Sequence, residues 1–147
     1  MVGWSGLALY GLYRTAPKEP WNEAARIVAE RAGPGDIVVF HSAPGEWPFR
    51  YYYERLRRAD AAPAPAVEMR GLPQDIERSE GALEREVTPA DLPRLDGLLA
   101  SGRPIWLILS HDDYVDETRL VTRHLDDRRA VSERTELYRI EVRRYAP

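Results

Sequence analysis

Apolar residues recur along the first half of the chain with the two periods that distinguish helices from strands. In residues 20–32 they follow i, i+3, i+4 and i+7 spacing, which predicts an amphipathic helix. The run 37–40 is continuously apolar and rich in β-branched residues, which is typical of a strand buried on both faces. A second helix is predicted over 48–56, where a proline occupies the first turn.

The same alternation continues beyond the Pro/Ala-rich connector that follows this helix. Residues 67–70 predict a short strand, and the polar segment 71–87 predicts an irregular loop. Leucines at helical spacing over 92–99 indicate another helix. The run 105–109 then predicts a second strand that is buried on both faces.

The C-terminal part begins with a helix and then changes period. The helix after the second buried strand is expected to be capped by Asp112 or Asp113. In 137–145 apolar and charged residues alternate, which predicts a half-solvated edge strand. Residues 129–134 are expected to pair with it in a hairpin that turns near 135–136.

Helices that alternate with buried strands imply parallel pairing and right-handed crossovers. The predicted fold class is therefore α/β, a three-layer sandwich with a mostly parallel central sheet and a C-terminal antiparallel hairpin. A length of 147 residues, with 44% apolar and 31% charged residues, fits one soluble globular domain. The net charge of −3 gives no reason to expect nucleic acid as a partner, and the lack of cysteine excludes disulfides and thiolate metal sites.

The N-terminus carries an uncharged apolar stretch, VGWSGLALYGLY, that ends at Arg14. It is shorter than the roughly 20 residues that a membrane-spanning helix needs. Two interpretations fit it: an amphipathic or buried N-terminal helix, or the end of a last transmembrane helix with its aromatic belt and a snorkelling cation. The expected organisation is a remnant of one of these helices over 1–14 and a soluble α/β domain over 15–147.

Polar residues directly follow the two buried strands: His41, Ser42, Ser110, His111, Asp112 and Asp113. Ligands of parallel sheets bind beyond the carboxyl ends of the strands, so two imidazoles and two carboxylates would converge if these strands are neighbours. Helix capping explains one carboxylate without any chemistry, and no spacing here is diagnostic of a metal site. The two histidines and two aspartates are therefore predicted as substrate-binding residues, with no catalytic residue, metal or cofactor assigned.

The segment WPFRYYYERLRR at 47–58 combines aromatic residues with arginines. Three consecutive tyrosines point to different sides of a helix and cannot all be buried together. One interpretation is that Phe49, Tyr52, Tyr53 and Leu56 pack on the sheet while the arginines are solvated. The other is a binding surface for lipid phosphates or a sugar-phosphate head group. Its predicted contact residues are Trp47, Arg50, Tyr51 and Tyr52.

Four motifs carry a family resemblance. They are K-E-P-W-x-x-A-A at 18–25, G-P-G-D at 33–36, P-F-x-Y-Y at 48–52 and R-P-I-W-L at 103–107. Together they resemble the C-terminal soluble domain of GT-C-type membrane glycosyltransferases, the bacterial proteins similar to dolichyl-phosphate-mannose or lipid-linked-sugar mannosyltransferases. The resemblance covers nearly the whole chain, but it consists of scattered positions and not of one signature sequence.

The resemblance implies that the full protein transfers a sugar from a polyprenyl-phosphate donor at the outer face of the cell membrane. The catalytic carboxylates of that family lie in loops between early membrane helices, so none is carried over to this chain. The chain is then a non-catalytic, extracytoplasmic accessory domain whose partners are the membrane and a lipid-linked sugar or acceptor. Two alternatives stay open: a free-standing small α/β enzyme or ligand-binding module, and a protein-interaction domain that uses a strand edge near Val142.

Overall fold

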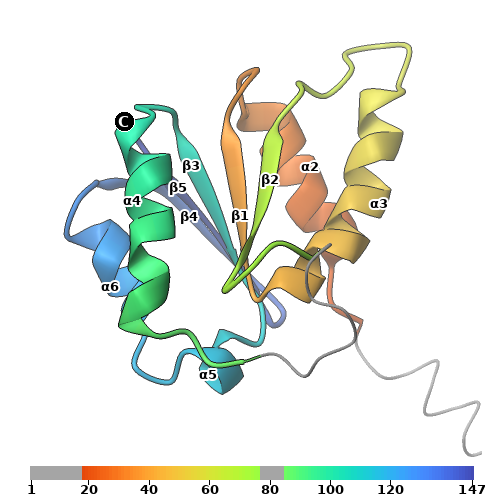
Figure 1. Cartoon of the computed structure of the whole chain (residues 1–147). Helices are drawn as coiled ribbons and strands as arrows, with labels where there is room; N and C mark the ends of the chain where they lie inside the picture. The colour runs from red at the N-terminus through yellow and green to blue at the C-terminus, as the bar shows by residue number, and fades with distance from the viewer. Residues whose placement is uncertain (1–17, 77–84) are drawn as a thin grey trace, which may run out of the picture.

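The computed structural model describes residues 18–76 and 85–147. The predicted N-terminal segment 1–14 and part of the predicted loop 71–87 thus lie outside the described residues. Figure 1 shows the helices and strands of the described part. In chain order they are α2 (Trp21–Arg31), β1 (Ile37–His41), α3 (Glu46–Arg57), β2 (Glu68–Leu72), α4 (Leu92–Ala100), β3 (Ile105–Leu109), α5 (Asp112–Val115), α6 (Leu120–Asp126), β4 (Val131–Leu137) and β5 (Ile140–Tyr145).

The strands form one five-stranded sheet in the order β2-β1-β3-β5-β4. β1 pairs in parallel with both β2 and β3, whereas β5 runs antiparallel to β3 and to β4. All five residues of β1 and all five of β3 are buried. The apolar runs 37–40 and 105–109 predict this burial, and β1 extends one residue further than predicted, to His41. The α/β class predicted from the sequence is therefore confirmed.

Helices cover both faces of this sheet, because successive strand residues point to opposite sides. Val38 and Phe40 of β1 share a hydrophobic cluster with α2 and α3. Ile37 and Val39 belong instead to the cluster that contains Leu95 of α4 and residues of α6. Figure 1 shows α2 and α3 on one side of the strands and α4 and α6 on the other. Among the helices of the described ranges, none is long and apolar enough to cross a membrane.

The prediction of a single helix after β3 is wrong. The structure has two short helices there, α5 and α6, and the chain between them turns at Asp116 and Arg119. Arg119 adopts a left-handed φ of 55°, which a continuous right-handed helix does not allow. Apolar spacing across 114–125 continues through this break, so periodicity alone could not locate it.

The predicted edge strand is an internal strand. Val142 of β5 lies opposite Ile108 on one side and Thr135 on the other, so both of its edges are paired. The outer strand is β4, and the hairpin turns at Tyr138–Arg139, where Arg139 has a φ of 58°. Val142 therefore offers no unpaired edge to a partner strand, and the edge of the hairpin belongs to β4.

Two buried polar groups fix the amino end of the sheet and the connector. Asp36 accepts hydrogen bonds from the indole N–H of Trp106 at 3.0 Å and from the Gly33 amide at 3.1 Å. The Tyr53 hydroxyl, which is fully buried, donates to the Pro65 carbonyl at 2.8 Å. Buried polar groups without partners are costly, so both contacts restrict the structure around them. The Asp36 contact joins the start of β1 to β3, and the Tyr53 contact joins α3 to the connector.

We expect the stabilising effect of the Tyr53 hydroxyl to disappear at alkaline pH. Burial raises the pKa of this phenol to about 12, whereas an unfolded tyrosine titrates near 10. Its contribution is therefore complete below about pH 10 and is lost as the pH rises towards 12. Tyr53→Phe should be less stable than the wild type by about 1 kcal/mol at pH 8 and should regain that difference near pH 12.

Urea unfolding of both proteins across this pH range makes the measurement. Tyr138→Phe, which removes an exposed hydroxyl from the hairpin turn, is the matched control. A stability difference for Tyr53→Phe that stays constant from neutral to alkaline pH would contradict the assignment.

Candidate functional site

The strand order of the sheet reverses between β1 and β3. From β1 the chain crosses through α3, on one face, to β2, and from β2 it returns through α4, on the other face, to β3. Pairing continues past the strand ends, since the Ser42 amide donates to the Ser110 carbonyl at 3.1 Å and the Ser110 amide donates to the His41 carbonyl at 2.8 Å. Open α/β sheets bind ligands at such a switch point, beyond the carboxyl ends of the strands.

A cavity of about 260 Å³ lies at this switch point, and we call it the switch crevice. Its walls come from the start of α2, the loop after β1, the first turn of α3 and the end of β3. The lining residues are Glu19, Trp21, Ser42, Pro44, Gly45, Pro48, Ser110 and His111. Only one of these residues, His111, was predicted from the sequence as a site residue.

A contact between a carboxylate and an imidazole forms one wall of the crevice. Glu19 Oε1 lies 2.6 Å from His111 Nε2, and Glu19 Oε2 accepts a hydrogen bond from the Trp21 indole at 3.0 Å. His111 adopts a left-handed φ of 55°, a conformation in which histidine is enriched among non-glycine residues. The contact ties the residues before α2 to the carboxyl end of β3.

Next to this contact, an indole packs against backbone. Trp21 is buried, and the loop after β1 lies so close to it that a Cβ built on Gly45 would be 2.6 Å from the indole ring. A side chain at position 45 would push the loop away from Trp21. Glycine therefore allows the close approach that gives the crevice a tight apolar side.

His41 lies on the other face of the sheet and does not reach the crevice. Its side chain is fully buried, with Nε2 3.2 Å from Asp116 Oδ2. The same carboxylate accepts hydrogen bonds from the Leu120 amide at 2.7 Å and the Val121 amide at 2.9 Å. Asp116 thus satisfies the first amides of α6, and it is this residue, and neither Asp112 nor Asp113, that caps the helix.

Asp112 and Asp113 line a second, wider cavity. It measures about 470 Å³ and lies between the α5–α6 region and the β4–β5 turn. Arg119 and Arg139 also line it, and His111 stands between the two cavities. The four predicted strand-end residues therefore do not form one site. His41 is buried against Asp116, His111 lies between the two cavities, and the two aspartates line only the second cavity. Residues at the ends of neighbouring strands can point to opposite faces of the sheet.

Trp47, Arg50, Tyr51 and Tyr52 lie on the exposed side of α3, and together with Arg55 we call them the α3 surface. The side chains of Trp47 and Tyr51 are 65% and 59% exposed. Arg55 donates to the Tyr51 hydroxyl at 2.9 Å and stacks over its ring. Arg50 pairs with the buried Glu46. Tyr52 is 37% exposed, although one interpretation of the sequence packs it on the sheet.

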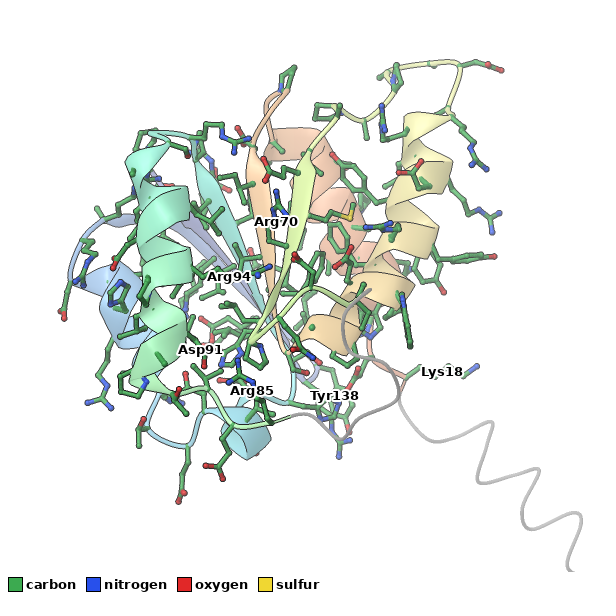
Figure 2. The ribbon with its side chains drawn as sticks, in the orientation of Figure 1. Lys18, Arg70, Arg85, Asp91, Arg94 and Tyr138 are labelled. Carbon is green, nitrogen blue, oxygen red and sulfur yellow. The ribbon has the colours of Figure 1, made fainter. Side chains whose placement is uncertain are left out.

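Asp75, in the loop after β2, is a carboxylate whose pKa is shifted by its surroundings. Burial favours protonation of Asp75, but hydrogen bonds from Arg94 and from the Gly71 amide hold its pKa below the ordinary value. Figure 2 shows Arg70 and Arg94 pointing towards the same region, and Arg70 also pairs with Asp75. Asp75 is therefore held as an anion that fixes the loop after β2.

In the described ranges, no group of three or more histidine, aspartate or glutamate residues is arranged to hold a metal ion.

Replacing Asp116 should destabilise the fold far more than replacing a neighbouring aspartate. Asp116→Ala removes the acceptor for two helix amides and the partner of His41, so we expect a loss of about 3 kcal/mol. Asp113→Ala alters an exposed side chain and should change stability by less than about 0.5 kcal/mol. Chemical denaturation of the two variants compares these values, and equal effects would show that the capping assignment is wrong.

The geometry described above stands without support from relatives. No protein-family model, no curated protein and no solved structure matches this chain.

Proposed function

We propose that this chain is an extracytoplasmic accessory domain of an integral-membrane glycosyltransferase that uses a polyprenyl-phosphate-linked sugar donor. By itself the domain is non-catalytic. The observation that carries the proposal is the contact between Glu19 and His111, which holds the first described residues at the carboxyl edge of the sheet. Figure 2 places Lys18 at this end of the molecule, where Tyr138 of the hairpin turn also lies.

This placement gives the domain an orientation. If the apolar segment 2–13 is embedded in lipid, only a few residues separate it from Glu19. The carboxyl edge, and with it the switch crevice, then faces the bilayer. A domain tethered in this way is in position to contact the head group of a lipid-linked donor or an acceptor close to the membrane surface.

The α3 surface supports the same orientation. α3 starts at the carboxyl edge, next to the switch crevice, and Trp47 stands in its first turn. Exposed tryptophan and tyrosine are enriched at membrane interfaces, and arginine pairs with phosphate oxygens through its planar fork. The α3 surface therefore combines an interfacial aromatic group with cations that suit lipid phosphates.

The surroundings of the predicted strand-end residues favour binding over catalysis. The His41 imidazole is fully buried against Asp116, and Asp116 is engaged at the start of α6. Asp112 and Asp113 open on the second cavity. The second candidate function, a free-standing small α/β enzyme or ligand-binding module, is favoured by the switch crevice, because such crevices are the usual ligand sites of this fold class.

Vesicle flotation tests the membrane contact. The whole chain should float with vesicles that contain an anionic phospholipid, and less so at high salt. The double variant Trp47→Ala/Tyr51→Ala should bind at least fivefold less, since it loses two interfacial anchors of roughly 1 kcal/mol each. Val131→Ala, which alters an exposed apolar residue at the opposite end of the sheet, is the control and should bind like the wild type. Equal binding of the double variant and the control would contradict the proposal.

The non-catalytic assignment has its own test. The purified chain should show no transferase or hydrolase turnover with a polyprenyl-phosphate sugar. Turnover that disappears in His111→Ala would replace the proposal with the enzyme alternative. The reading frame upstream of Met1 is a further check, since several apolar stretches of about 20 residues there would support the membrane assignment.

A further inference from the structure

The switch crevice presents hydroxyl groups and apolar surface in one small space. Ser42 and Ser110, side by side at the ends of β1 and β3, are buried residues that line it. A hydroxyl both donates and accepts hydrogen bonds. The Trp21 indole, Pro44 and Pro48 supply apolar wall next to these hydroxyls.

The lining of the crevice holds a carboxylate and neither of the two permanently cationic side chains. The Glu19 carboxylate lies 2.6 Å from His111 Nε2, so each side chain already has a polar partner in the crevice. Neither arginine nor lysine occurs among the eight described lining residues. Anion sites for phosphate normally rely on such cations or on free amides at a helix N-terminus. At the start of α3 the Gly45 and Glu46 amides already donate to backbone carbonyls, and Pro48 has no N–H. The crevice is therefore suited to a neutral ligand and not to a phosphate.

The size of the crevice limits that ligand further. Pockets for drug-sized molecules span roughly 300–1,000 Å³. At about 260 Å³ the switch crevice is just below that range and accommodates one six-membered ring with its substituents. A pyranose combines the required features, because its hydroxyls exchange hydrogen bonds in both directions and its C–H face packs on an aromatic or proline surface.

We propose that the switch crevice binds a single neutral sugar ring. Its hydroxyls bond to Ser42, Ser110 and Glu19, and its apolar face lies against the Trp21 side of the crevice. The binding itself stands on the crevice alone. The identification of this ring as part of the acceptor, held at the bilayer face of the domain, rests on the proposed function.

Titration of the whole chain with methyl α-D-mannopyranoside tests the site. The expected dissociation constant is on the order of 1 mM, as for other small neutral ligands of this size. In NMR spectra of the 15N-labelled chain, the amides of Ser42, Gly45 and Ser110 and the Trp21 indole N–H should shift on addition of the glycoside. Shifts confined to the second cavity, near Arg119, would overturn the assignment.

Three serine-to-alanine variants separate a specific site from a general effect. Ser42→Ala and Ser110→Ala each remove one hydroxyl from the crevice and should weaken binding about fivefold. Ser132→Ala removes an exposed hydroxyl on β4 and should leave binding unchanged. Equal affinity of all three variants would refute the proposal, and so would tighter binding of inorganic phosphate than of the glycoside.

Trp21→Ala is not a suitable probe, because Trp21 belongs to the buried core and its loss would unfold part of the domain. Pro48→Ala, which trims an apolar wall at the start of α3, is the suitable probe of the apolar side of the crevice. The two tests fail independently. A chain that floats with vesicles but does not bind the glycoside would overturn only the sugar site, and a chain that binds the glycoside but does not float would overturn only the membrane contact.

Discussion

The arrangement of this domain depends on the parallel pairing of β1 with β2 on one side and β3 on the other. Because the two connections run over opposite faces, they diverge at the carboxyl edge between β1 and β3, and the switch crevice lies at this point. The backbone bonds between Ser42 and Ser110 extend the pairing to the floor of this crevice. The polar groups of the site are therefore held by the rigid part of the fold, which keeps binding groups in place before a ligand arrives.

Much of the fold follows from local pattern. Continuous apolar runs predict β1 and β3, and helical spacing predicts α2, because burial on two faces or on one stripe dictates residue type at each position. The break at Asp116 was not predictable in this way, since the buried carboxylate depends on His41 from a distant strand. The internal position of β5 could not be predicted either. Alternation of apolar and charged residues indicates that one face of a strand is polar, but it does not indicate which strands lie on either side.

The site was predictable only in its location. The rule for carboxyl ends pointed to the loops after β1 and β3, and both contribute to the switch crevice. The convergence of His41 with His111 failed because strand parity sends the first imidazole to the α6 face. Glu19 was missed because its partner lies at the far end of β3 in the sequence, with no motif joining them. The exposed aromatic residues of α3 were recognised, since three adjacent tyrosines cannot share a buried face.

The central claim is that the crevice is part of the rigid sheet and not of a mobile loop. Amide hydrogen exchange of the whole chain tests it most directly, because exchange reports the free energy of local opening. The account predicts that the amides of Ser42 and Ser110 exchange as slowly as those in the middle of β1 and β3, since each donates to the neighbouring strand. Rapid exchange at these two amides, with slow exchange in the strands themselves, would contradict it.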